Sequence, residues 1–88
     1  MDERKLWTVE IILEETPDRT DATVTLRTGD AECTAEGHAH RNPDDPNVPR
    51  IGEELAAARA LAQLSSKLLE ESARILETHL GKAVHLTH

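Results

Sequence analysis

The chain has 88 residues, a formal net charge of −7 at pH 7 and a single aromatic residue, Trp7. This length is enough for one domain over residues 1–88, and it excludes a large multidomain enzyme. The acidic charge repels phosphate backbones and anionic lipids, so it disfavours broad nonspecific binding to nucleic acids or membranes. Cys33 is the only cysteine, so no internal disulfide is expected. No apolar run has the length of a membrane span or of a signal-peptide core, and a cytoplasmic protein is expected.

Three segments in the first half of the chain show the alternation of apolar and polar residues that is typical of strands. They are expected at residues 5–14, 21–28 and 31–41. A Pro-Asp pair lies in the first connection, and a Gly-Asp pair in the second is a hairpin signal. The side chains expected to share the inner face are Trp7, Val9, Ile11, Leu13, Ala22, Val24, Leu26, Cys33, Ala35, Gly37 and Ala39.

Helical spacing of apolar residues follows in the second half. Pro49 suits the first turn of a helix, and Gly81 suits the position just beyond its C-terminus. A helix over 49–80 would be on the order of 45 Å long, whereas strands of nine residues span about 30 Å, so the helix is expected to overhang the sheet. The stripe expected to face the sheet consists of Ile51, Leu55, Ala58, Ala62, Leu69, Leu76 and Leu80.

Together these elements predict an α+β fold, a three-stranded antiparallel sheet packed against one long C-terminal helix in the order β-β-β-α. The apolar arc of the helix is wider than one such sheet needs. The extra row, or shoulder, predicts a homodimer built on that shoulder or on the face or edge of the sheet; alternatively, its leucines pack on the chain's own loops and tail. The tail, residues 83–88, either adds a short strand or is disordered. The shoulder consists of Leu61, Leu64, Leu68 and Ile75.

Several side chains are of types that can act in catalysis or metal binding. His38 and His40 lie two apart on one strand face, where both could bind one metal ion, but a solvated face explains the same spacing and no metal site is predicted. Cys33 is expected among small inner-face residues, which favours a small hydrophobic role over a nucleophile. Asp44 and Asp45 fit a plain turn. We therefore expect no enzyme, no cofactor and no small-molecule substrate. The histidines available to complete a metal site are His79, His85 and His88.

Positive charge gathers near the end of the third strand and the loop that follows it. Because the chain lacks aromatic platforms for stacking unpaired bases, recognition of duplex RNA by shape is the form of RNA binding that fits it best. Ten basic residues against seventeen acidic residues make the supply of phosphate contacts sparse. Arg59 is expected to pair instead with Glu residues or with Asp44 and Asp45. The residues expected to contact RNA or another partner are His38, His40, Arg41 and Arg50, with Arg27 nearby.

One motif links the third strand to the helix. It reads Gly37-His38-Ala39-His40-Arg41-Asn42-Pro43 and, after a short acidic loop, Val48-Pro49-Arg50-Ile51-Gly52-Glu53-Glu54-Leu55 and Ala58-Arg59-Ala60-Leu61. In this motif the chain resembles domain-of-unknown-function family 1876, whose members are short actinobacterial proteins. The resemblance implies a β-β-β-α domain similar to the double-stranded-RNA-binding fold. It also implies a link with stress or dormancy, and dimers shaped like ribosome hibernation factors, but no catalytic residues.

Two functions are compatible with these features. The first is a non-enzymatic, homodimeric, stress-associated protein that contacts RNA or the ribosome through its Arg41 and Arg50 end. The second is an interaction or structural module that binds another protein through its sheet edge or helix shoulder and has no nucleic-acid role.

Overall fold

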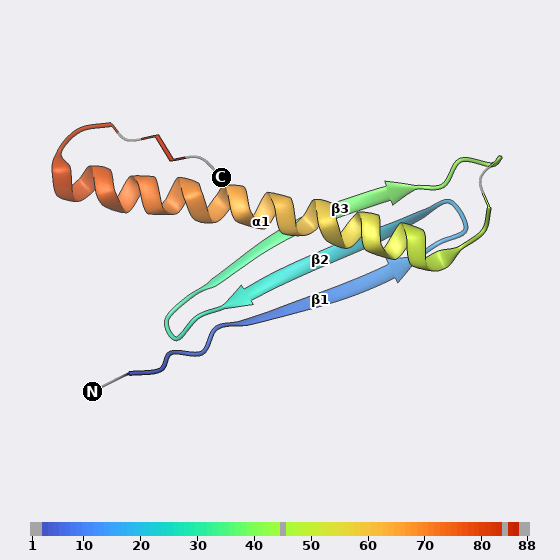
Figure 1. Ribbon diagram of the computed structural model, residues 1–88, viewed down its shortest axis with the longest axis horizontal. Helices are drawn as coiled ribbons and strands as arrows, with labels where there is room; N and C mark the ends of the chain where they lie inside the picture. The colour runs from blue at the N-terminus through green and yellow to red at the C-terminus, as the bar shows by residue number, and fades with distance from the viewer. Residues whose placement is uncertain (1–2, 45, 84, 87–88) are drawn as a thin grey trace.

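The computed structural model describes residues 3–44, 46–83 and 85–86. Its three strands form one antiparallel sheet in the order β1-β2-β3, and one helix covers one face of that sheet (Figure 1). The predicted α+β class is therefore confirmed, although β1 begins later and β2 earlier than the sequence indicates. The elements are β1 (Thr8–Glu15), β2 (Arg19–Arg27), β3 (Glu32–His40) and α1 (Pro49–Leu80).

The first hairpin is tighter than expected, since β2 begins at Arg19 rather than Asp21. The Thr16 hydroxyl accepts hydrogen bonds from the amides of Asp18 at 3.4 Å and Arg19 at 3.1 Å. The Thr16 amide in turn donates to the Arg19 carbonyl at 2.9 Å. The Thr16 side chain thus provides hydrogen-bond partners for the backbone amides of the turn. The turn is therefore short, and Arg19 and Thr20 belong to β2.

The core between the sheet and α1 is thin and rich in alanine. Among the described residues, Val24 is the largest side chain that is fully buried. β3 supplies only small side chains, as its inner row of Ala, Gly and Cys residues predicts. The buried residues are Ala22, Val24, Leu26, Ala35, Ala39, Ala56, Ala60 and Leu64, with Cys33 and Leu68 partly buried beside them.

Gly37 in β3 lets the backbone of α1 rest directly on the sheet. A methyl group built on Gly37 would lie 2.3 Å from the amide nitrogen of Ala60 and 2.4 Å from the carbonyl oxygen of Ala56. Glycine inside a strand commonly marks such a close approach of another backbone. Ala56 and Ala60 are both fully buried at this contact, because only small side chains fit there.

The helix is turned about its own axis relative to the sequence prediction. Ile51 and Leu55, which were expected to face the sheet, are 53% and 45% exposed. At about 100° per residue, the buried Ala60 and the stripe residue Ala62 point roughly 200° apart. The prediction is wrong because leucine and isoleucine side chains cannot enter the narrow space above Gly37, so the alanine face packs inward.

The ends of α1 lie where the sequence predicts them. Pro49 follows the N-cap residue Val48, and Gly81 is left-handed (φ 71°) with its amide donating to the Glu77 carbonyl at 2.7 Å. The 32 residues of the helix extend about 48 Å. No helix residue after Leu68 belongs to the core, so the last turns overhang the sheet (Figure 1). Over the described ranges, no helix is both long and apolar enough to cross a membrane.

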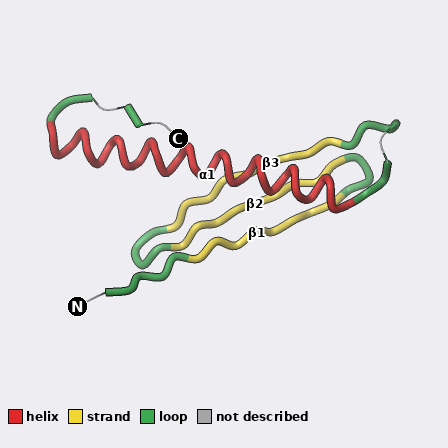
Figure 2. Tube along the Cα trace, viewed as in Figure 1, coloured by secondary structure: helices red, strands yellow, loops and turns green. Residues whose placement is uncertain are grey.

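Part of the C-terminal tail is described. Residues 82–83 and 85–86 lie outside the sheet and turn back along α1 (Figure 2). The strand considered over 83–88 also involves residues 84, 87 and 88, which lie outside the described residues.

Gly37→Ala should destabilise the protein, because the added methyl group meets backbone atoms that cannot swing aside. We expect the free energy of unfolding to fall by about 1–3 kcal/mol in urea denaturation. Gly29→Ala is the matched control: nothing lies within 4 Å of its added methyl group and its φ is not positive. Its effect should stay within about 0.5 kcal/mol. Equal stability of the two variants would mean that α1 does not rest on Gly37.

Candidate interaction surface

β1 is exposed along its whole length. The inner-face side chains of Val9, Ile11 and Leu13 are 49%, 40% and 38% exposed, whereas their partners across β2 are at most 4% exposed. The cause is the position of α1, which packs on β3 and β2 and touches β1 only slightly (Figure 1). One apolar row of the sheet is therefore left without a cover.

A heptad row of α1 adds to this exposed surface. Leu68 is half buried, and Leu61 and Ile75, one heptad before and after it, are 39% and 55% exposed. Trp7, which is 57% exposed, lines a shallow cavity of about 230 Å³ together with Leu68 and Ile75. We call the whole surface the open apolar face. It consists of Trp7, Val9, Ile11, Leu13, Leu61, Leu68 and Ile75.

Two sequence expectations need correction here. Leu64, predicted as a dimer contact, is 5% exposed and lies in the chain's own core. The alanine face of α1 packs inward, and Leu64 follows Ala60 by one turn on that face. Trp7, expected within the first strand, precedes β1; it lies on the expected side, in one cavity with Leu26 and Leu68, but is 57% exposed. Leu61, Leu68 and Ile75 keep accessible surface.

The chain exposes more surface than its mass requires. Its accessible surface is 7113 Å² for 9.7 kDa, whereas a compact monomer of this mass exposes roughly 5,100 Å². The excess of about 2,000 Å² is larger than the roughly 800 Å² that each partner contributes to a standard protein interface. The bare face of β1 and the overhang of α1 therefore leave ample room for an interface.

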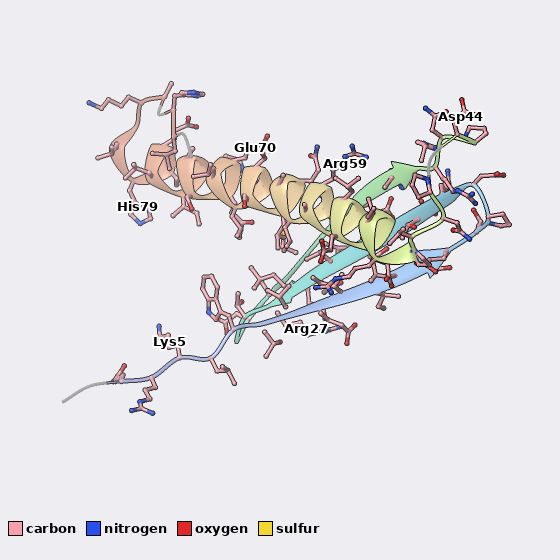
Figure 3. All side chains as sticks on the ribbon, turned by 45° about the vertical axis from the view of Figure 1, so that its right-hand side comes forward. Lys5, Arg27, Asp44, Arg59, Glu70 and His79 are labelled. Carbon is pink, nitrogen blue, oxygen red and sulfur yellow. The ribbon has the colours of Figure 1, made fainter. Side chains whose placement is uncertain are left out.

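The outer edge of β3 is covered by two cationic side chains of α1. Arg59 Nη1 donates to the His38 carbonyl at 2.7 Å, and Lys67 Nζ donates to the Thr34 carbonyl. Figure 3 shows Arg59 on the side of the helix that lies beside β3. Eight residues of helix advance about 12 Å and four residues of strand about 13 Å, so the two spacings match. Charged side chains on a sheet edge hinder pairing with another strand.

Sequence reasoning missed this edge cover. Arg59 was expected to pair with carboxylates, among them Asp44, but its guanidinium bonds a backbone carbonyl of β3 instead. The available signal was the spacing of eight residues between Arg59 and Lys67. This spacing alone does not predict a contact with β3, because a cationic pair eight residues apart is also typical of a solvated helix face. The rotation of the helix must be known first.

His38, one of the residues predicted to contact RNA, belongs to an ion-pair network on the outer face of the sheet. Its Nδ1 lies 2.7 Å from Asp21 Oδ1, and Arg19 Nη2 lies 3.0 Å from Asp21 Oδ2. The hydrogen bond with His38 and, to a lesser extent, the Arg19 charge hold the pKa of Asp21 below its ordinary value. The carboxylate therefore offsets the positive charge of this part of the sheet.

Arg50 and Arg27, also expected in this region, are both paired. Arg27 lies at the opposite end of the sheet from Arg41, across from Glu32 at the start of β3. Arg50 Nε lies 2.9 Å from Glu54 Oε1, one turn along α1. Arg27 Nε lies 2.9 Å from Glu32 Oε2, and its Nη1 lies 3.8 Å from Glu10 Oε1. Carboxylates thus neutralise most of the charge that the sequence placed in this region.

Arg41 differs from these residues. Its amide donates to the Asp18 carbonyl at 2.8 Å, and no carboxylate of the described residues lies within 4.0 Å of its guanidinium. Arg41, Thr20 and Pro49 line an open cavity of about 450 Å³ at the start of α1. His40, the remaining candidate, is exposed at the end of β3.

The histidines considered for a metal site do not converge within the described ranges. His38 and His40 share the outer face of β3. His79 lies in the overhanging part of α1, where its Nδ1 bonds the Ile75 carbonyl at 2.8 Å (Figure 3). Among residues 3–44, 46–83 and 85–86, no three His, Cys, Asp or Glu side chains form a group that could hold a metal ion. Cys33 packs half buried against the core.

Comparison with known proteins gives a consistent family assignment. Mb1767 of Mycobacterium bovis and MT1780 of Mycobacterium tuberculosis, both described as uncharacterized, are each 42% identical over 71 residues, covering 81% of this chain and 76% of theirs. Rv2632c of M. tuberculosis, also described as uncharacterized, is 31% identical over 84 residues, covering 96% of this chain and 90% of its own.

The crystal structure of Rv2632c has the same fold. It aligns with a TM-score of 0.83 at 30% identity over 92% of this chain and 96% of that chain. The profile of the Rv2632c-like family matches residues 5–85. Since this match includes the sheet, the helix and part of the tail, the chain belongs to the Rv2632c-like family.

Proposed function

We propose that this protein is a non-enzymatic interaction module that works as a homodimer, with the open apolar face as its contact surface. The observation that carries the proposal is the uncovered inner row of β1. Val9, Ile11 and Leu13 expose between 38% and 49% of their surface beside a core made mainly of alanine. Large apolar side chains gathered on one face commonly mark a protein contact.

The energetic reason lies in the burial of this row. Fully burying a Val, Leu or Ile side chain contributes about 1.5–3 kcal/mol, so completing the burial of these three is worth roughly 1 kcal/mol each. A homodimer gains this on both copies, and Leu61, Leu68 and Ile75 add to it. The gain must exceed the cost of association, which is also several kcal/mol.

The non-enzymatic part of the proposal is supported by the setting of the most perturbed carboxylate. Asp21 owes its lowered pKa to His38 and Arg19 on an exposed strand face, not to burial in a cleft. Structural ion pairs shift pKa values in this way without any catalytic role. A cytoplasmic location, which the single cysteine favours, is part of the same proposal.

Contact with structured RNA or the ribosome, in a stress or dormancy setting, is the second candidate function. It rests on Arg41, which lines the cavity at the start of α1 and whose guanidinium forms no ion pair with a carboxylate of residues 3–44, 46–83 and 85–86. The second candidate also draws on the likeness to the double-stranded-RNA-binding fold and to domain-of-unknown-function family 1876. The β-β-β-α order of the chain supports this likeness. The net charge of −7 opposes it, because each phosphate contact must overcome repulsion from the rest of the surface.

Ile11→Lys should dissociate the proposed dimer, because it places an unpaired charge in the apolar row of β1. We expect the dimer Kd to rise roughly a hundredfold or more, measured by sedimentation velocity. Ile12→Lys is the matched control, since Ile12 is 51% exposed on the opposite face of the same strand, and it should leave the mass unchanged. A wild-type protein that stays monomeric at tens of micromolar, or two variants that dissociate equally, would contradict the proposal.

Arg41→Glu tests the second candidate. Co-sedimentation with ribosomes should be detectable at low salt, weaken as salt rises and be lost in this variant, because phosphate contacts are salt-dependent. Arg4→Glu, an equal change of charge in the exposed N-terminal segment, is the control and should bind nearly as well as the wild type. A protein that remains in the top fractions at every salt concentration has no ribosome contact.

A further inference from the structure

The hydrogen bonds of the first hairpin reveal which backbone groups of β1 point outward. In an antiparallel pair, residues alternate between those bonded to the neighbouring strand and those whose N–H and C=O point away from it. The Thr16 amide donates to the Arg19 carbonyl, and this pair continues the register of β1 with β2. Even-numbered residues of β1 therefore bond β2, and the backbone groups of Val9, Ile11 and Leu13 point to the open edge.

The two edges of the sheet are therefore unlike. On β3, Arg59 and Lys67 donate to two of the outward carbonyls. On β1, no side chain of the described residues donates to the carbonyls of Val9, Ile11 or Leu13. These three residues also carry the apolar row of the inner face. Free backbone groups and exposed apolar side chains thus coincide on one strand, which is the arrangement that invites a further strand.

Charge selects how a second copy would align. Two antiparallel registers pair seven of the eight residues of β1 with a second copy, and their twofold axes pass through Ile11 or Ile12; an axis at Glu10 or Leu13 pairs only five. The axis through Ile12 sets Glu10 opposite Glu14. The axis through Ile11 sets Glu10 opposite Ile12 and Thr8 opposite Glu14, so no two carboxylates meet. Because like charges directly across a strand pair are destabilising, the axis through Ile11 is favoured.

We propose that two copies of this chain pair edge to edge along β1, with Ile11 on the twofold axis, so that their sheets join into one antiparallel sheet of six strands. This inference rests on the proposed homodimer and gives its geometry. Val9 of one copy lies opposite Leu13 of the other, and the two Ile11 residues face each other. The outward groups of these residues then form roughly six hydrogen bonds. The apolar rows of the two copies then lie side by side, so that each covers part of the exposed side chains of the other.

The covered edge of β3 explains why such an assembly would stop at two copies. A β1 edge that paired with a β3 edge would leave free edges and grow into a filament. Arg59 and Lys67 hold the outward carbonyls of His38 and Thr34, so that pairing is hindered. Pairing of β1 with β1 consumes both open edges in a closed, symmetric dimer.

Amide hydrogen exchange of the unmodified protein tests the edge contact. At a concentration where sedimentation gives a dimer, the amides of Val9, Ile11 and Leu13 should exchange about tenfold or more slowly than in the Ile11→Lys variant. The amides of Thr8 and Ile12, which bond β2, are the internal control and should be protected in both samples. Rapid exchange of the three outward amides in a protein that is dimeric would overturn the edge contact and leave the proposed homodimer intact.

Single-cysteine variants test the register. In a Cys33→Ala background, Ile11→Cys should form a disulfide with its own copy under mild oxidation. Glu10→Cys and Ile12→Cys should not self-link, because copies two residues out of register lie about 7–8 Å apart, beyond disulfide reach. A mixture of those two variants should link, since each then faces the other.

The outcomes separate the two proposals. Self-linking of Glu10→Cys or Ile12→Cys in place of Ile11→Cys would overturn the register. Absence of every disulfide in samples that sediment as dimers would overturn the β1 contact and leave the homodimer. A monomer in both the wild type and the Cys33→Ala background would remove the homodimer and this inference together.

Discussion

The backbone of α1 rests directly on Gly37 of β3, a residue without a side chain. The contact is so close that a methyl group added to Gly37 would lie 2.3 Å from the amide nitrogen of Ala60. This contact fixes the helix above β3 and β2. Because a helix about 10 Å wide cannot also cover the far strand, the inner row of β1 stays open. The same contact turns the alanine face of α1 inward and leaves Leu55 and Ile51 in solvent. The interface proposed here is thus a consequence of where one glycine lies.

The elements of the fold could be predicted from the sequence because their signals are local. Alternation gives the three strands, and Pro49 and Gly81 give both ends of α1. The rotation of the helix could not be predicted, because a hydrophobic stripe ranks large side chains above small ones, whereas close packing on Ala35, Gly37 and Ala39 demands the reverse. Leu64 was misplaced for that reason.

Positions on the sheet were predicted better than pairings between side chains. Charge near His38, Arg41 and Arg50 is visible in the sequence, but the carboxylates that pair with His38 and Arg50 come from β2 and from the next turn of α1. Whether a cation is free or paired depends on register and rotamer, which composition does not contain. The role of Arg59 at the β3 edge was missed on the same grounds: its acceptor is a backbone carbonyl, which leaves no trace in a sequence.

The two edges also distinguish the candidate functions. A surface for RNA needs unpaired cations, and the described residues of this chain use five of their ten Lys and Arg side chains for internal contacts, including two on the β3 edge. A surface for another protein needs exposed apolar area and unsatisfied backbone groups, and β1 presents both. The negative charge of the chain opposes RNA binding more than it opposes binding to a second copy. In the proposed dimer, Glu10 and Glu14 can be kept apart by the choice of register.

The scarcity of aromatic residues has a practical consequence. Trp7 is the only tryptophan, and the chain has no tyrosine or phenylalanine, so the intrinsic fluorescence of the protein arises from one side chain at the border of the open apolar face. Its emission wavelength depends on local hydration. A partner that binds this surface will therefore change the fluorescence of Trp7, and no other aromatic side chain of the protein contributes to that emission. Binding to the native chain can be followed in this way without an added label.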